Sequence, residues 1–407
     1  MARSILYVGQ FSFPAGGANA LRVHANALAL RTAGFDVLVL ASGRQQPREA
    51  QEIVDPAYRE VPFRCAETRS VLGTNRAGRL LSYIASGSRL VKLVHQELAL
   101  GNVHAVIATA GGQLRHFIPL SRCCEHFGIP LVCDVMDWYE PSHLPFGRFG
   151  PLRLEHEVCM RRVFPRIGSI ITISRYLEEY FTRNGCATIC IPPLVDMSVC
   201  KWSRYQLVST GEVVQLAFVG SAGRKDLLVN AIRGIALLGE DARKIKVDIV
   251  GPTRCEVVNS LSEDGHLLDC LTSVLNFIGP LPHNDALRHL MKADFSILLR
   301  PDLRFAHAGF PTKLVESMAM GVPVICNLTS DIGTYVHDGQ EGLVVPDCSP
   351  EAFATGLRRA MALSAEQRTA MRAFARRRAE ASFDYRNWSV PLGEFLSQVI
   401  ENQGRKR

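Results

Sequence analysis

Residues 309–321 read GFPTKLVESMAMG, and the apolar run VPVIC follows directly at 322–326. A Gly-Phe loop, a proline at the expected first helical position and a closing Gly321 predict a short helix that leads into a buried strand. Lys313 falls in the first turn, where a cation opposes the helix dipole at a cost of about 0.3–1 kcal/mol. An anion bound at this helix start would explain the lysine.

Thr312 and Glu316 are four residues apart and therefore share one face of the predicted helix. A phosphate at the helix start and a carboxylate one turn further along describe a nucleotide site, in which Glu316 accepts hydrogen bonds from ribose hydroxyls. The alternative is a surface helix on which Lys313 and Glu316 pair with each other. The motif alone leaves both interpretations open.

Outside this motif, strand-like apolar runs alternate with helical segments, a pattern typical of α/β proteins with parallel sheets. The alternation stops near Pro192 and restarts near residue 213, so we predict two doubly wound domains, 1–195 and 213–384, with a linker at 196–212. A ligand is expected in the cleft between them, at the carboxyl ends of the strands. The strand-like runs are residues 4–9, 36–40, 105–109, 131–134, 170–173, 188–191, 215–219, 246–250, 276–278, 295–299, 322–326 and 342–345.

The composition is that of a globular protein, with 407 residues, 47% hydrophobic and 21% charged. No apolar run approaches the roughly 18 residues of a membrane span, and the N-terminal run is too short for a signal peptide, so we expect a cytoplasmic protein. The net charge of +7 is compatible with several anionic partners and does not choose among them. The twelve cysteines contain no Cys-x2-Cys pair, which favours buried thiols over a metal site.

A second cationic helix start lies at residues 220–226, which read GSAGRKD. Arg224 and Lys225 fall where the next helix, expected over 224–238, begins. Arg300 adds a third cation at the end of a strand-like run. Around one point these groups would form a clamp for a diphosphate. Each of them alone is also compatible with a solvated surface charge.

These motifs, in this order, resemble the retaining glycosyltransferases of the GT-B fold, family-4 type, and the resemblance covers nearly the whole chain. It implies two Rossmann-like domains and a nucleotide-sugar donor. Lys225 matches the family's phosphate-binding lysine, and Glu316 matches the second, ribose-binding glutamate of a Glu-x7-Glu motif. The aromatic stretch 383–388 matches the point where the last helix crosses back, so that residues 385–407 complete the first domain.

The Glu-x7-Glu motif is incomplete, because its first glutamate should fall at position 308 and this chain has Ala308. In the family that glutamate touches the donor sugar, so the identity of the sugar stays open. His307 and the backbone of Gly309 and Phe310 are the nearest substitutes.

Two further family positions differ. Ser221 stands near the place of an arginine that precedes the phosphate-binding lysine, and Arg224 or Arg300 could replace it. The histidine often found after the fourth strand is missing; His116 is nearest, and we expect it on the following helix. Gly16 and Gly17 lie in the expected turn at 14–19. They are expected to let the backbone approach the diphosphate and the acceptor.

The resemblance implies retaining transfer of a sugar to a hydroxyl acceptor, such as a lipid-linked saccharide, a polysaccharide or a small molecule. The chain has no Asp-x-Asp motif, so we expect no metal and no cofactor besides the donor substrate. The available acceptor-side groups are Asp137, Glu140 and His116. The predicted catalytic residues are Lys225, Glu316 and Arg300, and the predicted donor-binding residues are Gly16, Gly17, Ser221, Arg224, His307, Gly309, Phe310, Pro311, Thr312 and Lys313.

Other functions stay open. A different GT-B enzyme, such as a nucleotide-sugar epimerase or a phosphorylase, shares the fold, although no phosphorylase motif is present. A GT-B protein that lost activity and became a binding or regulatory subunit would tolerate Ala308. A dehydrogenase is disfavoured, because no Gly-x-Gly-x-x-Gly follows the first strand. Residues 80–100 predict a helix with a basic side, either docked peripherally on anionic lipid or simply solvated. We expect no nucleic-acid partner.

Overall fold

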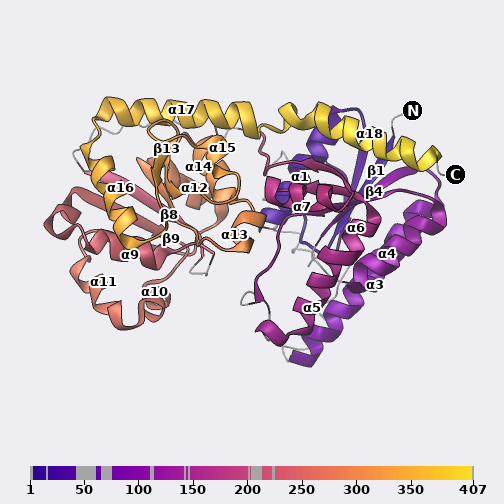
Figure 1. The fold of residues 1–407 in the computed structure, drawn as a ribbon, viewed down its shortest axis with the longest axis horizontal. Coiled ribbons are helices and arrows are strands. Elements are labelled where there is room, and N and C mark those ends of the chain that lie inside the picture. Colours follow the sequence, from indigo (N-terminus) through magenta and orange to yellow (C-terminus); the bar gives the residue numbers. More distant parts are fainter. Residues whose placement is uncertain are drawn as a thin grey trace. The chain divides into compact units, whose positions relative to one another are not determined.

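The computed structural model describes residues 3–14, 17–42, 61–65, 76–110, 114–141, 144, 147–199, 202, 213–221 and 225–405. The chain divides into two compact units. The first comprises Met1–Asp196 and Tyr385–Arg407, and the second comprises Met197–Asp384. Each unit is built on one parallel sheet with helices on both faces (Figure 1), which confirms the predicted α/β class with two Rossmann-like domains.

Among the described residues, the first unit has a seven-stranded parallel sheet with the strand order β3-β2-β1-β4-β5-β6-β7. Six of these strands coincide with the predicted apolar runs. The edge strand β3 was not predicted, because its three residues are partly exposed and form no apolar run. The strands are β1 (Ser4–Gly9), β2 (Asp36–Ala41), β3 (Phe63–Cys65), β4 (Val103–Thr109), β5 (Leu131–Val135), β6 (Ser169–Thr172) and β7 (Ala187–Cys190).

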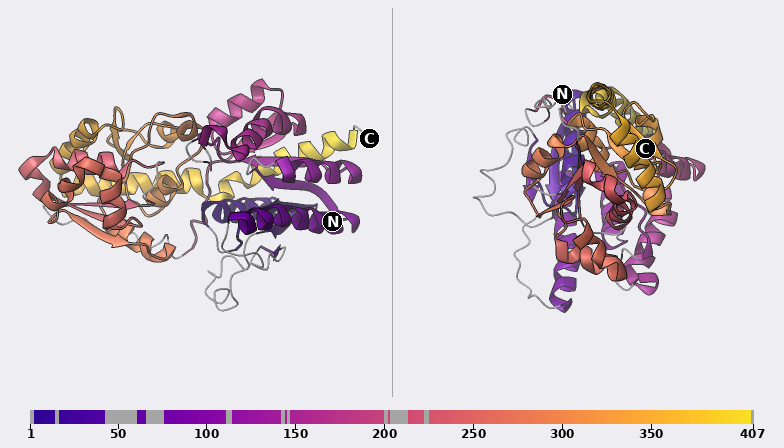
Figure 2. Two further views of the ribbon diagram at one scale, coloured as in Figure 1. Left: turned by 90° about the horizontal axis from the view of Figure 1, so that it is seen from below. Right: turned by 90° about the vertical axis from the view of Figure 1, so that its left-hand side faces the viewer.

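One face of this sheet is covered by α1 (Gly17–Thr32) and α18 (Ser389–Arg405), and the other face by α3 (Arg76–Ala99) and α4 (Leu114–Phe127). Figures 1 and 2 both show the yellow α18 among the indigo and magenta elements of this unit. The remaining helical segments are η3 (Gly147–Phe149), α5 (Pro151–Val158), η4 (Cys159–Val163), α6 (Phe164–Ile167), α7 (Arg175–Arg183) and η7 (Tyr385–Trp388).

The start of α1 differs from the prediction. We expected a glycine-rich turn over 14–19, whereas the helix already begins at Gly17. Glycine has a weak intrinsic helix propensity, so its presence predicts a turn, but the packing of the apolar face of α1 against the sheet overrides that preference.

An ion pair is sealed inside the first unit, between α1 and β5. The guanidinium of Arg22 lies 2.7 Å from the carboxylate of Asp134, and the two residues are 3% and 0% exposed. Arg22 also donates to the carbonyl of Ile191 at 2.8 Å, and the Tyr7 hydroxyl donates to Asp134. Burial and the neighbouring Asp134 raise the pKa of Tyr7, so that it remains a donor. A buried charge pair is tolerated only when such additional bonds satisfy both groups.

Among the described residues, the second unit has a six-stranded parallel sheet with the order β10-β9-β8-β11-β12-β13. All six strands overlap predicted apolar runs. Most of the predicted linker at 196–212 lies outside the described residues, but Trp202 within it is buried, and its carbonyl accepts a hydrogen bond from Arg376. The strands are β8 (Val214–Val219), β9 (Ile245–Val250), β10 (Leu275–Gly279), β11 (Phe295–Leu298), β12 (Val324–Asn327) and β13 (Gly342–Val345).

The core on one face of this sheet joins β8 to α9 (Leu228–Ala236) and α16 (Pro350–Ala362). The other face carries α12 (His283–Lys292) and α14 (Thr312–Ala319), and α17 (Ala365–Phe383) packs against α14. The remaining helical segments are η5 (Gly239–Lys244), α10 (Arg254–Leu261), η6 (Ser262–His266), α11 (Leu267–Cys270), α13 (Arg304–Ala308) and α15 (Ile332–Tyr335).

Two hydrogen bonds in the C-terminal half of α14 hold the helix in place. Ser317 on its inner side bonds the Ser296 hydroxyl of β11 at 2.6 Å. At its C-terminal end, the buried Arg376 of α17 donates to the carbonyl of Ala319. A cation at a helix C-terminus satisfies carbonyls that have no partner within the helix. The helix that carries Lys313 and Glu316 is therefore held firmly.

Candidate functional site

Polar side chains gather at the carboxyl ends of the strands in the second unit. The side chain of Asn327, the last residue of β12, accepts from the backbone N–H of Arg300 at 2.9 Å and donates to its carbonyl at 2.8 Å. This two-way bond fixes the end of β12 to the chain that leaves β11. It anchors the segment that leads on to α13 and α14. These two helices and the loop between them contain six of the ten predicted donor-binding residues.

Lys313 lies in the first turn of α14, as predicted, but its partner is not Glu316. Its ammonium group forms an ion pair with Asp226, which lies 87 positions away in the sequence. The same nitrogen lies 5.0 Å from the centre of the Phe218 ring. It also fills the space beside Gly220, where an added Cβ would come within 2.0 Å of it. The alternative of a Lys313–Glu316 surface pair is therefore wrong.

Glu316 bonds a residue that the sequence analysis missed. Its Oε1 lies 2.8 Å from Nε2 of His283, the first residue of α12. The side chain of Glu316 is 14% exposed and that of His283 is 44% exposed. The carboxylate therefore stands at a partly open edge, one turn beyond Thr312 on α14. No spacing in the sequence could have indicated the histidine, because it comes from another strand-to-helix connection.

Arg300 is buried, and its guanidinium donates to the carbonyl of Ala306 in α13 at 3.0 Å. At least one of its donors thus holds α13 in place. A contribution of Arg300 to a diphosphate clamp stays a prediction.

In the segment from His307 to Pro311, the side chains of His307 and Phe310 are engaged by other residues of the second unit. His307 accepts from the backbone N–H of Ser330 through Nδ1, at 3.3 Å, and its Nε2 bonds Asp302. Phe310 is 6% exposed and packs edge-on against Tyr335, with 5.6 Å between the ring centres. Its side chain belongs to the core, so Gly309 and Phe310 can offer a ligand only backbone groups. Among the predicted substitutes for the missing glutamate, His307 thus already bonds other residues through both ring nitrogens.

The two helix starts differ from the predictions. α14 begins at Thr312, with Pro311 as its N-cap, and no side chain caps it. This is one residue later than predicted, within the usual uncertainty of helix ends. The second helix, expected from residue 224, begins only at Leu228, so Lys225 precedes it and is not in its first turn. Ser221 is exposed. The predicted residues Gly16 and Arg224 lie outside the described residues, and Gly17 belongs to the first unit.

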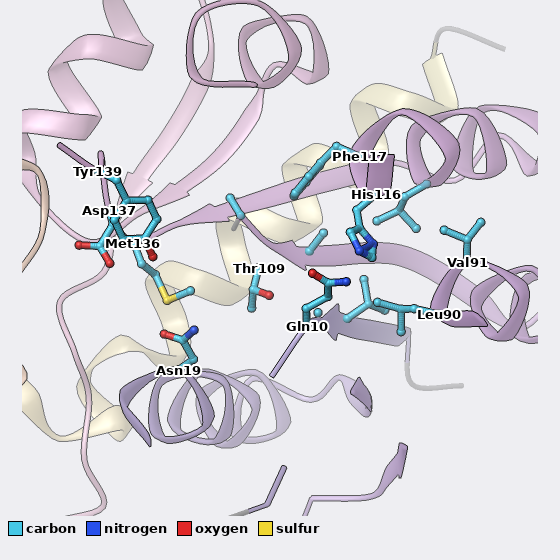
Figure 3. A pocket seen from close by; sticks show the side chains of 15 residues that line it. Gln10, Asn19, Leu90, Val91, Thr109, His116, Phe117, Met136, Asp137 and Tyr139 are labelled. Carbon is cyan, nitrogen blue, oxygen red and sulfur yellow. The ribbon is translucent and has the colours of Figure 1, made fainter. Parts of the chain in front are cut away.

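The first unit has a cavity of its own, of about 80 Å³, at the carboxyl ends of its strands. Figure 3 shows Gln10 from the end of β1, Thr109 from the end of β4 and His116 from α4 around it. Leu90 of α3 and Phe117 of α4 contribute apolar walls. Polar groups among apolar walls are found in small-molecule sites, but such sites have volumes of roughly 300–1,000 Å³, so this cavity has room for only a few atoms of a ligand.

His116 is on the helix after β4, as expected, and it lines this cavity. Burial lowers the pKa of His116 to about 4, so its imidazole is neutral near pH 7. Asp137 and Tyr139, from the segment after β5, line the same cavity. Burial, and then the charge and hydrogen bond of Asp137, raise the pKa of Tyr139, which stays protonated. Glu140 is partly buried and is not among the lining residues.

Comparison with known proteins gives matches on both units. The model "Glycosyl transferases group 1" matches residues 204–378, and the model "Glycosyl transferase 4-like domain" matches residues 16–191. A curated relative, the amylovoran biosynthesis glycosyltransferase AmsK of Erwinia amylovora, is 25% identical over 250 residues, which is 60% of each protein. The chain thus spans less than two thirds of this relative's length.

Solved structures match over the whole chain. Sucrose-phosphate synthase from Thermosynechococcus elongatus has a TM-score of 0.71 at 16% identity, covering 98% of this chain and 100% of that one. HepE of Anabaena, solved with UDP and glucose, has a TM-score of 0.64 at 16% identity, covering 98% and 99%. The two family models together match most of the chain, so it belongs to the group 1, or family-4, glycosyltransferases, and its fold is GT-B. The predicted family and fold are thereby confirmed.

One further finding bears on the membrane. Within the part of the chain that the structure describes, no helix is both long enough and apolar enough to cross a bilayer.

Proposed function

We propose that this protein transfers a sugar from a nucleoside diphosphate sugar to a hydroxyl acceptor, with retention of the anomeric configuration that is general in its family. The observation that carries this proposal is the group at the carboxyl edge of the second sheet. There Lys313 lies against Gly220, and Glu316 follows one turn along α14. HepE, which shares the fold, was solved with UDP and glucose, which supports a donor of the nucleotide-sugar class.

In this proposal the residues act through charge and position. Glu316 accepts hydrogen bonds from the ribose hydroxyls. Lys225, Lys313 and the uncapped first amides of α14 stabilise the diphosphate as the bond to the sugar breaks, because fixed charges and dipoles cost no reorganisation at that moment. Arg300 keeps α13 and the start of α14 in place, in addition to the charge that it contributes. The sequence has no Asp-x-Asp motif, and we therefore assign this neutralisation to the chain's own cations.

The acceptor hydroxyl is proposed to enter the cavity of the first unit. With a pKa of about 4, His116 is a poor proton acceptor at neutral pH and fits a role in orienting a hydroxyl. Asp137, at the same cavity, is the better candidate for taking up the acceptor proton. The relative named for amylovoran biosynthesis favours a growing polysaccharide or its lipid-linked precursor as the acceptor class.

A second function is favoured by one observation. Ala308 replaces the glutamate that would touch the donor sugar, and it is fully buried. A protein with an intact nucleotide site and a weakened sugar site would bind donor without turning it over, as a binding or regulatory subunit.

One set of measurements separates these functions. Thermal shifts with UDP, GDP, ADP and TDP identify the base, because a ligand at 100 times its Kd stabilises the folded state by about 2.7 kcal/mol. Transfer and hydrolysis of the matching nucleotide sugars are then followed by release of the diphosphate. Turnover supports the transferase. Tight binding with no turnover of any sugar supports the binding subunit, and no shift with any nucleotide contradicts both.

Peripheral contact with an anionic membrane is proposed on the polar side of α3. In the part of this helix whose side chains are described, Arg89 and Lys92 are exposed, whereas Leu90, Val94 and Leu98 are buried in the unit. Attachment through this segment would be electrostatic and weakened by salt. Flotation with anionic vesicles in low and high salt tests it, and an absence of binding in both conditions removes the idea.

A further inference from the structure

Two features of the second unit keep the amine of Lys313 in one place. The first is Asp226, whose carboxylate pairs with it from the segment that follows β8. The second is Gly220, which has no side chain where the amine lies. A lysine in the first turn of a helix is unfavourable by itself, and the glycine directly after β8 leaves the space that its amine fills. Both choices are explained if the position of the amine matters.

The pair is a poor candidate for a purely structural contact. The side chains of Lys313 and Asp226 are 28% and 13% exposed, so that water reaches both groups. Ion pairs that remain in contact with solvent contribute little to stability, because solvation and screening offset their attraction.

We infer that Asp226 occupies the place of the donor's diphosphate in the unliganded protein, and that the diphosphate displaces it as the partner of Lys313. This inference rests on the proposed function and deepens it, because it names the group that competes with the diphosphate for Lys313. A diphosphate carries more charge than a carboxylate and offers several acceptor oxygens, so it can replace Asp226 when it binds. Lys313 then contributes to binding with an amine that is already in position, and Asp226 weakens binding through its like charge.

Three substitutions separate charge from position. Lys313→Met removes the charge and keeps the length of the chain. Asp226→Asn keeps the shape and a hydrogen-bond acceptor but removes the competing charge. Gly220→Ala keeps both charges, and its methyl group takes the place of the amine. This glycine does not have the positive φ that would strain an alanine, and the obstructing atoms are the flexible end of a side chain, so the variant is expected to fold.

The experiment is calorimetric titration of each variant with the nucleoside diphosphate that binds the wild type most tightly, and with its parent nucleoside. A charge-assisted bond to phosphate predicts that Lys313→Met weakens diphosphate binding by about 10- to 100-fold. Gly220→Ala should weaken it in the same direction, and Asp226→Asn should tighten it by about 3- to 10-fold. Affinity for the nucleoside, which lacks phosphate, should change less than about twofold in all three variants.

Lys244 and Asp241 provide a matched control, because their ion pair at 2.7 Å lies on an exposed turn of the same unit. Lys244→Met and Asp241→Asn should leave both affinities unchanged. Weaker binding in Asp226→Asn overturns the inference and leaves the proposed function standing. Wild-type diphosphate affinity in Lys313→Met overturns the inference and also removes Lys313 from the proposed donor site. A wild type that binds none of the nucleoside diphosphates overturns both.

Discussion

Two ion pairs stand at the carboxyl ends of the two parallel sheets, and they differ in their access to water. Arg22 and Asp134 in the first unit are 3% and 0% exposed, and hydrogen bonds from Tyr7 and to Ile191 complete their surroundings. Lys313 and Asp226 in the second unit have side chains that are 28% and 13% exposed. The first pair has no room for another partner, whereas the second can exchange one.

The difference shows how burial divides structural charges from functional ones. A sealed pair whose members are bonded to several groups cannot release one of them without leaving a buried charge unpaired. A pair that is partly exposed can release one of its members, because water or a ligand then takes the place of that member. We therefore expect substitutions in the first pair to act on stability and substitutions around the second to act on binding and turnover.

The largest effect is expected for Arg22→Leu, which leaves the Asp134 carboxylate buried without its cation. Loss of one partner of a buried pair costs about 3–5 kcal/mol of unfolding free energy. Urea unfolding against wild type measures it, with the exposed Arg31→Leu on the same helix as control. A loss below about 1 kcal/mol would remove the distinction between the two pairs.

A buried histidine gives the first unit a second stability effect, which depends on pH. The pKa of His116 is about 4 in the folded chain and about 6.5 in the unfolded chain. Between about pH 4 and pH 6.5, His116 is therefore protonated in the unfolded chain and neutral in the folded chain. Stability is therefore full above about pH 6.5 and falls as the pH drops towards 4, by an amount on the order of 3 kcal/mol.

His116→Gln should remove that part of the pH dependence, and His126→Gln, on the same helix, should retain it. Unfolding free energies measured at several pH values between 7 and 4 give the comparison. Equal slopes for wild type and His116→Gln would contradict the assignment.

For the second unit we expect the largest kinetic effect from Lys225→Ala. Removal of one preorganised charge at the leaving group should lower kcat by about 100-fold or more. The unfolding free energy should change by less than about 1 kcal/mol, since the residue is not fully buried. The exposed Lys292→Ala on α12 is the control, and unchanged kinetics in Lys225→Ala would show that the site is assigned wrongly.

Glu316→Ala should act mainly on donor binding, because its proposed partners are ribose hydroxyls that do not change during the reaction. The loss of bonds to a charged acceptor predicts a Kd for donor raised by roughly tenfold or more, with a smaller change in kcat. Titration with nucleoside and with diphosphate locates the loss. Weakened binding of the nucleoside is required, since the ribose is present in both ligands.

The smallest effect is expected for the stability of Lys313→Met. A pair still in contact with water contributes about 0–1 kcal/mol, and the apolar methionine keeps the contact with Phe218. The free energies of unfolding of Lys313→Met and Arg22→Leu, both measured in urea, complete the comparison of the two pairs. A loss as large as that of Arg22→Leu would make the Lys313 pair structural after all.

Much of the fold could be predicted from the sequence, because buried parallel strands appear in it as continuous apolar runs. The edge strand β3 could not be predicted in this way, since Phe63 and Arg64 are exposed and the strand has three residues. The helix starts at Gly17 and Leu228 were misjudged because glycine-rich or cationic stretches resemble turns and caps, whereas tertiary packing decides where a helix begins.

The residues of the candidate site were named from the sequence, and their roles stay predictions, whereas the contacts between them could not be named in this way. Lys313, Glu316 and Lys225 were named from motif and resemblance, yet the partners Asp226 and His283 come from distant segments that no local spacing connects. Phe310 was assigned to the ligand through its backbone, and that assignment stays a prediction. The sequence did not show that its ring packs in the core, because an aromatic residue in a loop can lie in the core or at a ligand.

The chain passes between the units twice, since Tyr385–Arg407 returns to the first one. The second unit is thus one uninterrupted span, whereas the first is made of two segments that are far apart in the sequence. The first cannot be obtained by simple truncation before α18, because Leu392, Leu396 and Val399 would no longer cover their share of its core. A fragment design for acceptor studies has to join the terminal helix to the first 196 residues through an engineered connection.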